Sequence, residues 1–354
     1  MWTQWDSNPR PLPCEGSALP TELWAHHSLC CAFSSTFIKR LIERVFKLKK
    51  EQFNMKYFIL ERCAKMLKER NFNVEVFIGF NTCLDIVAKK ESSIYFIKIL
   101  YNIDALRLET AKEILRLAFT FDAIPIIIGH KTKREILKDG IAYERFNIIA
   151  FSLNTFKDFI EGKNPVAKYF KGKLSTKIDY KRLNDVRKKL NYSLAKLAEK
   201  LNISRNALHK YEKGKNPSLE VALNLEKILK CKLIKGITIA SKVDECEDFS
   251  LKERDALLEK LSNYVKIKTF AHAPFKAFSN KISLLIDSSM YKNFERKILK
   301  LEKSKRVLEA KSLLLVKKSS HKKILSTPVL QEDELDSISN DKDLEKLIKE
   351  RESV

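Results

Sequence analysis

Residues 179–229 read DYKRLNDVRKKLNYSLAKLAEKLNISRNALHKYEKGKNPSLEVALNLEKIL, and this stretch decides how the rest of the chain is organised. Ser193 precedes four apolar residues at helical spacing, and a serine hydroxyl accepts well from the backbone N–H groups at a helix start. These apolar residues are Leu194, Leu197, Ala198 and Leu201. The pattern predicts a helix that begins after Ser193 and ends near Leu201.

A turn and a second helix follow. Asn202 stands where the chain must turn, and asparagine tolerates the left-handed backbone conformation better than other non-glycine residues. Ser204 is the expected N-cap of a helix over residues 205–213, whose apolar face is formed by Leu208 and Tyr211. Two short helices therefore meet at a tight corner.

Small and helix-ending residues define the corner further. Ala198 has a side chain small enough for the second helix to pack closely across the first. Gly214 is the expected C-terminal cap of the second helix, and Ser218, which follows Pro217, is the expected N-cap of the next one. The sequence therefore predicts a third helix after residue 218.

The remaining side of the second helix carries hydrogen-bond donors. Arg, Asn, His and Lys side chains have the donors that contact guanine, adenine and phosphate edges in the major groove. We expect Arg205, Asn206 and His209 to face base edges, with Lys210 and Lys213 nearer the phosphates. The complete set of candidate DNA-binding residues is Ser204, Arg205, Asn206, His209, Lys210, Lys213 and Lys215.

This stretch resembles the helix-turn-helix of phage Cro, lambda repressor and their relatives. The family's pattern appears here as Leu197-Ala198, Ile203-Ser204-Arg205, Tyr211-Glu212, Gly214 and Pro217-Ser218. The resemblance implies a small five-helix bundle that binds double-stranded DNA, with a core that includes Leu197, Ala198, Asn202, Ile203, Leu208 and Tyr211. Two positions depart from the family: Leu194 replaces a glutamine that often braces DNA contacts, and Asn202 replaces glycine in the turn.

The resemblance also implies a homodimer. One reading helix contacts too few base pairs to select a genomic site, so relatives usually bind palindromic half-sites as two-fold dimers. The chain carries one such bundle, and a second one must come from a second chain. The candidate apolar contacts are Leu225, Ile228, Leu229, Leu233 and Ile234, although the same residues also suit the core of the bundle itself.

Length and composition favour a globular protein with a polyanionic partner. The 354 residues suffice for two or three domains, and 68 basic against 45 acidic side chains give a net charge of +23. A basic proteome or a thermophile's surface would also produce this charge. The seven cysteines show no CxxC or metal spacing, which indicates a reduced, cytoplasmic protein. No apolar stretch reaches the ~18 residues of a membrane span.

Residues 1–54 differ in composition from the rest. All three tryptophans lie within the first 24 residues, and the segment lacks the basic and apolar regions of a signal peptide. Residues 5–9, WDSNP, can be encoded by TGG GAT TCG AAC CCA, which contains the reverse complement of a sequence resembling a transfer-RNA T-loop. We therefore expect a non-native leader over residues 1–54, with Met55 as an alternative start, although residues 37–54 could also form a helix.

Residues 55–163 predict an α/β domain that opens with an amphipathic helix after Met55. The expected elements that follow are strands over 73–79, 83–89 and 94–101, a helix over 106–121, strands over 123–128 and 148–151, and a helix over 154–162. Residues 164–177 contain Pro165 and Gly172 and are expected to form a linker to the helix-turn-helix domain of residues 178–240.

After a second expected linker over residues 241–249, residues 250–354 repeat the α/β plan. The expected elements are a helix over 251–264, strands over 265–270 and 282–287, a helix over 291–308 and a strand over 313–316. We interpret the two α/β domains as a divergent duplication on either side of the bundle. The alternative is coincidence, because the αβββαβ order is common.

The αβββαβ order also resembles the restriction-endonuclease-like fold, whose metal site is an Asp on one strand and Glu-x-Lys on the next. Asp85 and Lys98 have about the right separation, but Phe96 stands where the Glu belongs. A divalent ion for phosphodiester cleavage usually needs at least two carboxylates. The second copy has Asp287 at a strand end and no acidic partner for Lys281. We therefore expect no catalytic residues, no metal and no cofactor.

These observations predict a sequence-specific DNA-binding transcriptional regulator that is not an enzyme. It resembles archaeal proteins that carry this bundle between α/β segments. Two other classes remain open: a metal-dependent, nuclease-like DNA-processing protein that uses a flanking α/β domain, and a non-catalytic protein-interaction module.

Overall fold

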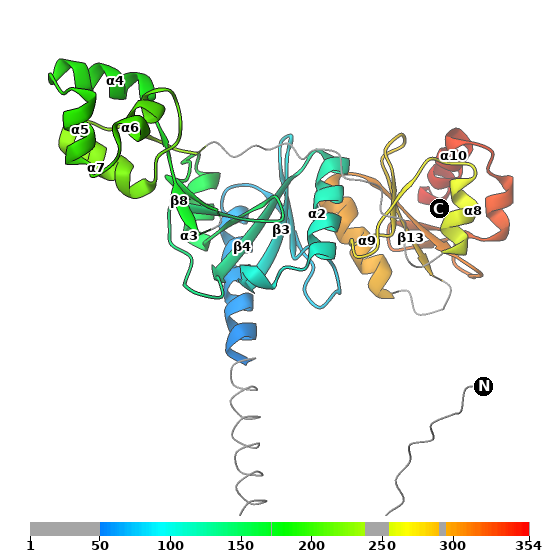
Figure 1. Cartoon of the computed structure of the whole chain (residues 1–354). Helices are drawn as coiled ribbons and strands as arrows, with labels where there is room; N and C mark the ends of the chain where they lie inside the picture. The colour runs from blue at the N-terminus through cyan, green and yellow to red at the C-terminus, as the bar shows by residue number, and fades with distance from the viewer. Residues whose placement is uncertain (1–49, 171, 238–254, 290–294, 354) are drawn as a thin grey trace, which may run out of the picture. The chain divides into compact units, whose positions relative to one another are not determined.

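The computed structural model describes residues 50–170, 172–237, 255–289 and 295–353, whose helices and strands are drawn in Figure 1. The expected leader up to residue 49 and the expected linker over residues 241–249 lie outside these ranges. The larger compact unit begins at Asn54. Within the described ranges, no helix combines the length and the apolar character that a membrane crossing requires.

A helix over residues 50–68 precedes the first sheet. Its residues Ile59, Cys63 and Leu67 recur every four positions and are all buried, so they form one packed face. The expected amphipathic helix is confirmed, although Phe58 is exposed.

The first sheet has eight strands in the order β1-β2-β3-β4-β6-β5-β7-β8. The β1, β2 and β3 strands form an antiparallel meander, and β3, β4 and β6 run parallel to one another. The strands are β1 (Asn73–Val76), β2 (Ile86–Lys90), β3 (Ser93–Asn102), β4 (Ile124–Lys131), β5 (Ile141–Arg145), β6 (Ile148–Phe151), β7 (Ala167–Phe170) and β8 (Lys173–Ser175).

Residues 164–177 are not the simple linker that the sequence suggested. They contain β7 and β8, because β7 pairs in parallel with β5 and β8 folds back against β7. Of the two residues that indicated a linker, Pro165 precedes β7 and Gly172 lies between β7 and β8. The β5 strand was also not expected, since its pairing with β6 and β7 is not visible in its own sequence.

Helices cover both faces of this sheet. The α2 helix (Leu108–Phe121) connects β3 to the parallel β4 and buries Ile114 and Leu117 in one apolar cluster. The helix of residues 50–68 and α3 (Leu153–Ile160) pack in a second apolar cluster on strand residues such as Ile97 and Ile126. The domain is therefore an α/β/α sandwich, visible around β3 and β4 in Figure 1.

The helix-turn-helix region consists of α4 (Tyr180–Lys189), α5 (Leu194–Lys200), α6 (Arg205–Glu212) and α7 (Leu219–Leu229), grouped together in Figure 1. The expected fifth helix does not occur within residues 172–237. After α7 the chain turns at Lys230, which adopts a left-handed conformation. It then forms β10 (Ile234–Lys235), which pairs with β9 (Lys177–Ile178) and so closes the bundle at its base.

The second α/β domain has a six-stranded sheet in the order β11-β12-β13-β14-β16-β15. Its strands are β11 (Lys268–Thr269), β12 (Ala277–Ser279), β13 (Leu284–Ser289), β14 (Lys311–Val316), β15 (Lys323–Ile324) and β16 (Thr327–Gln331). Its helices are α8 (Ala256–Ser262), α9 (Glu295–Leu308) and α10 (Asp341–Glu352).

The two sheets share one topology. The β1-β2-β3-β4-β6-β5 part of the first sheet corresponds strand by strand to the second, with the same parallel and antiparallel pairings. The α2 and α9 helices are the equivalent crossovers between parallel strands. The expected repetition of the α/β plan is confirmed at the level of topology.

Candidate nucleic-acid interface

Serine caps and one left-handed residue build the corner between α5 and α6. The Ser193 Oγ accepts the Lys196 backbone N–H and the Ser204 Oγ accepts the Ala207 backbone N–H, both at 3.1 Å. Asn202, between the two helices, has a φ of 51°. Each of these features has the position that the sequence predicted.

The two helices are held together by a small apolar core. Leu197, Ala198 and Leu208 are buried, and Ile203 and Tyr211 pack against them while partly exposed. Asn202, which was grouped with the core residues, is exposed, because its role lies in the backbone turn. The close approach of α5 and α6 leaves only one side of α6 in contact with solvent.

The end of α6 is also capped as expected. Gly214 has a φ of 94°, a conformation that glycine adopts without strain, and the Lys215 N–H donates to the Lys210 carbonyl at 3.0 Å. Ser218 then caps α7 by accepting the Val221 N–H at 3.3 Å.

We call the exposed side of α6, together with the exposed residues that directly flank the helix, the reading face, and it includes all seven candidate residues. They are Ser204, Arg205, Asn206, His209, Lys210, Lys213 and Lys215, and every one is exposed. A shallow pocket gathers Ser204, Asn206, Lys210 and Lys215 beside Ala207 and Tyr211. Arg205, His209 and Lys213 do not line this pocket.

The cations of the reading face are not neutralised within the described part of the bundle. The ion pairs found between residues 172 and 237 are Arg187–Glu212 and Lys235–Asp179. The reading face therefore presents positive charge together with amide and imidazole groups, a combination that suits a duplex with acidic phosphates and polar base edges.

The Arg187–Glu212 pair is a site residue pair that sequence reasoning missed. Arg187 Nε lies 2.5 Å from Glu212 Oε1, its Nη2 lies 3.2 Å from Oε2, and its Nη1 donates to the Tyr192 carbonyl at 2.9 Å. The two side chains are only 11% and 7% exposed. This buried fork fixes α4 to the last turn of α6, and thereby orients the reading face.

The apolar residues proposed as dimer contacts mostly complete the bundle core. Leu225, Leu229 and Leu233 are buried in it, and Ile228 and Ile234 pack against it. The three buried leucines are therefore unavailable as a primary contact between chains, whereas Ile228 and Ile234 remain partly exposed.

In the first α/β domain, Asp85 occupies the position expected for a nuclease metal ligand, directly before β2. It is 7% exposed. Its Oδ1 accepts from Lys56 Nζ at 2.9 Å, and its Oδ2 accepts the Ile99 N–H at 2.8 Å and lies 3.3 Å from Lys98 Nζ. Lys98 Nζ also donates to the Thr82 carbonyl at 3.1 Å. Both carboxylate oxygens are thus engaged by the protein's own groups.

The second α/β domain has a lysine at the position of Asp85. The Asp85 N–H donates to the Ile97 carbonyl, and the Lys276 N–H donates to the Ile286 carbonyl, both at 2.9 Å. Because Ile97 and Ile286 lie at the same point of equivalent strands, Asp85 and Lys276 are structural equivalents.

Lys276 makes the same ion pair with its charges reversed. Its Nζ donates to Asp255 Oδ2 at 2.6 Å, whereas Asp85 accepts from Lys56. Asp255 caps α8, just as Lys56 belongs to the helix before the first sheet. Burial opposes ionisation of Asp255, but hydrogen bonds from Lys276 and Ser288 outweigh it and hold the pKa of Asp255 below its usual value.

A third charged residue near each of these ion pairs also has the opposite sign in the other domain. Asp287 is the equivalent of Lys98 and is 1% exposed, with Lys297 Nζ and Lys300 Nζ at 3.8 and 3.9 Å. Burial raises the pKa of Asp287 in spite of these two lysines. We call the two sets the Asp85 cluster (Lys56, Asp85, Lys98) and the Lys276 cluster (Asp255, Lys276, Asp287).

Neither cluster fits a divalent cation. In the first, the ammonium groups of Lys56 and Lys98 already neutralise Asp85, and Phe96 is buried in the apolar core where a second carboxylate would be needed. In the second, Lys276 places a positive charge at the ligand position. No group of three or more His, Cys, Asp and Glu side chains suited to a metal occurs among the described residues.

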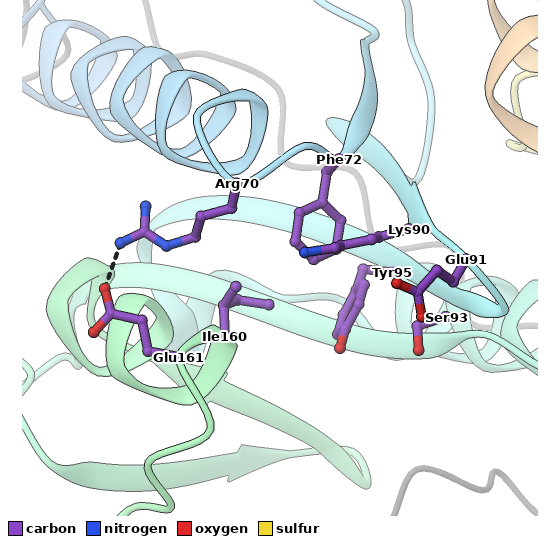
Figure 2. Close-up of a pocket in the computed structure, with 8 residues that line it drawn as sticks. All are labelled: Arg70, Phe72, Lys90, Glu91, Ser93, Tyr95, Ile160 and Glu161. Carbon is purple, nitrogen blue, oxygen red and sulfur yellow. Dashed lines mark hydrogen bonds and ion pairs between the residues drawn. The ribbon is translucent and has the colours of Figure 1, made fainter.

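An open pocket in the first α/β domain contrasts with the reading face. Figure 2 shows it between the end of the first helix, the β2–β3 hairpin and α3, with Arg70 pairing with Glu161 at one side. Lys90 Nζ lies 5.5 Å from the centre of the Phe72 ring, which in turn meets Tyr95 edge-on. The charge of Arg70 in this pocket is thus neutralised by Glu161, whereas the basic residues of the reading face form no such ion pair within the described bundle.

Comparison with known families identifies both kinds of domain. Residues 56–165 match a PD-(D/E)XK superfamily domain, in agreement with the expected restriction-endonuclease-like resemblance, and residues 183–235 match a helix-turn-helix domain. No solved structure matches the chain.

Similar proteins named "Putative HTH-type transcriptional regulatory protein" occur in archaea. The one from Methanococcus maripaludis strain C6 is 32% identical, over 84% of this chain and 98% of the relative. The one from Methanocaldococcus jannaschii is 33% identical, over 79% and 92%. The one from Archaeoglobus fulgidus is 30% identical, over 83% and 97%.

We predict that Glu212→Ala destabilises the bundle by about 3 kcal/mol, because it leaves the Arg187 guanidinium buried without its partner. Amide hydrogen exchange across α4–α7 in the full-length protein measures the loss. Lys235→Ala, which removes the more exposed pair with Asp179, is the control and should cost no more than about 1 kcal/mol. Equal effects of the two changes would contradict the role of the buried fork.

Proposed function

The chain belongs to the family of archaeal HTH-type transcriptional regulatory proteins, and we propose on this premise that it regulates transcription by binding specific DNA sequences. The observation that carries the proposal is the reading face. Seven exposed polar or basic residues lie on the open side of a capped helix and at its two ends, while its other side packs on the bundle core. Such a helix enters the major groove in the known proteins of this type.

The residues of the reading face divide into two roles. Arg205, Asn206 and His209 are assigned to base edges, because their side chains combine donors with fixed planar geometry. Lys210, Lys213 and Lys215 are assigned to phosphates, since a flexible ammonium group neutralises charge without reading sequence. The Ser204 Oγ accepts the Ala207 backbone N–H at the start of α6, and its hydroxyl proton is free to be donated to a phosphate.

The net charge of +23 supports the same partner. Release of condensed counterions from DNA makes such binding fall with rising salt. This charge disfavours a function confined to protein–protein interaction. A regulator of chromosomal genes in an archaeal cell acts in the cytoplasm, where the DNA lies.

We assign no catalytic role to the PD-(D/E)XK domain. Cleavage in this fold depends on a divalent ion, and the Asp85 cluster offers one carboxylate that two lysines already neutralise. The Lys276 cluster offers a cation at the ligand position. The alternative function as a nuclease therefore lacks a metal site in either copy.

We propose that the regulator is a homodimer, since one reading helix covers too little DNA for specific binding. We assign the contacts between the two copies of the chain to exposed leucines of the bundle rather than to residues of its core. Leu190 at the end of α4 and Leu223 on α7 are 48% and 51% exposed, so both are accessible to a second chain.

We predict that Arg205→Ala and Asn206→Ala each weaken binding to a specific site by ~1 to 3 kcal/mol and change binding to random DNA little. The specific site is obtained by selecting random duplexes with the wild-type protein, and affinities are measured at fixed salt. Lys227→Ala and Asn224→Ala, exposed on α7, are matched controls. Equal losses on both kinds of DNA would show that α6 does not read sequence.

We predict that the protein leaves supercoiled plasmid intact in the presence of Mg²⁺ or Mn²⁺, because neither α/β domain can hold the ion. Gel electrophoresis of the plasmid measures this, beside a nuclease of the same superfamily as positive control. Divalent-ion-dependent cleavage that disappears in Asp85→Asn would refute the non-catalytic assignment.

We predict a sedimenting species near twice 41.1 kDa at micromolar concentration. Leu223→Glu should shift it to the monomer, because a buried charge would oppose association. Leu325→Glu, which changes a leucine that is 67% exposed in the second α/β domain, is the control. A wild-type monomer that protects a single half-site would rule out the dimer.

A further inference from the structure

Two contacts that α2 makes with the second α/β domain occupy the same positions as two contacts that α9 makes with the first. We propose that the two α/β domains are the halves of an internal two-fold interface, the single-chain equivalent of a homodimer. The interface itself, rather than the chain connection between the domains, then holds the halves together. This goes beyond the proposed DNA binding and does not depend on it.

Equivalent positions follow from the strand registers. Phe77 and Phe270 are equivalent, because the Phe77 N–H donates to the Asp85 carbonyl at 3.0 Å and the Phe270 N–H donates to the Lys276 carbonyl at 2.7 Å. In the crossovers, α2 and α9 each have 14 residues and are each followed by one residue of positive φ, Asp122 and Glu309.

The first repeated contact is a cation above a phenylalanine ring. The guanidinium of Arg116 on α2 lies 5.4 Å from the centre of the Phe270 ring. The ammonium of Lys303 on α9 lies 6.0 Å from the centre of the Phe77 ring. Counted back from the ends of their helices, Arg116 and Lys303 hold the same position. Each half therefore gives the other the same interaction.

The second repeated contact lies about one turn further along each helix. Arg306 Nη2 of α9 lies 3.0 Å from Glu75 Oε1 in β1. At the equivalent positions, Lys268 Nζ of β11 lies 5.2 Å from the centre of the Phe119 ring of α2. The chemistry has diverged, but the two position pairs still meet, as an isologous interface requires.

An apolar core shared by both halves lies between these contacts. One continuous buried cluster includes Val87 of the first domain and Phe278 and Leu308 of the second. Phe121 of the first domain packs against this cluster. The Phe121 and Phe278 rings lie 4.4 Å apart between centres. Shared cores of this kind are typical of obligate subunit interfaces rather than of loosely linked domains.

Hydrogen bonds to backbone groups add specificity on each side. Glu113, buried on α2, accepts the Ala271 and His272 N–H groups at 2.6 and 3.1 Å. Lys303 on α9 donates to the Val76 carbonyl at 2.6 Å. Because such bonds depend on the position of the main chain, they fix the register of each helix on the opposite sheet.

The proposal has a consequence for assembly between chains. The faces of α2 and α9 that contact the opposite domain are occupied within one chain, so a second chain has no access to them. A dimer that pairs two copies of α6 must therefore form through another surface. Each of its subunits would contain one pair of two-fold related α/β domains and one helix-turn-helix bundle.

The test uses the full-length protein with a protease recognition sequence inserted into residues 241–249, cut after purification. We expect the two pieces to co-elute at the volume of the uncut protein in size-exclusion chromatography at micromolar concentration. Separation of the pieces under these conditions would overturn the proposal. DNA binding is not part of this readout, so failure here leaves the proposed function intact.

Variants of the cut protein test the symmetry. Arg116→Ala and Lys303→Ala should each raise the dissociation constant of the two pieces by about threefold, measured by analytical ultracentrifugation on dilution. Arg134→Ala, an exposed arginine in the β4–β5 connection, is the control and should have no effect. An effect of one helix variant without the other would show that the interface is not two-fold.

Discussion

A charge removed from water beneath a helix must meet an opposite charge, and this constraint governs both α/β domains. In the first, Asp85 joins the helix of residues 50–68 to β2 and β3 through Lys56 and Lys98. In the second, Lys276 joins α8 to the equivalent strand junction through Asp255. The two domains share one strand order, and in each of them an ion pair between side chains joins the preceding helix to the sheet.

The helix-turn-helix was largely predictable from sequence because its signals act over short distances. The caps at Ser193, Ser204 and Ser218 and the turns at Asn202 and Gly214 each bond within a few residues of themselves. The features that sequence reasoning missed depend on distant partners. Arg187 meets Glu212 only after the bundle closes, and β7 exists only because β5 lies beside it. The charge reversal between the clusters likewise required the strand register to align Asp85 with Lys276.

The chain divides its tasks between a small reading unit and a larger support. The bundle has a small apolar core. A buried arginine–glutamate ion pair and four side-chain helix caps add further restraints on the positions of its helices. The α/β domains contribute a core that extends through both copies.

The reversed signs of the two clusters also bear on how one chain folds two similar sheets without exchanging their parts. If the helix of residues 50–68 docked on the second sheet, Lys56 would approach Lys276, and if α8 docked on the first sheet, Asp255 would approach Asp85. Each exchange would break the ion pair that joins a helix to its own sheet and would place like charges together at half-buried positions. Fused repeats are prone to such misassembly. The opposite polarity of the two half-buried ion pairs therefore favours the docking of each helix on its own sheet.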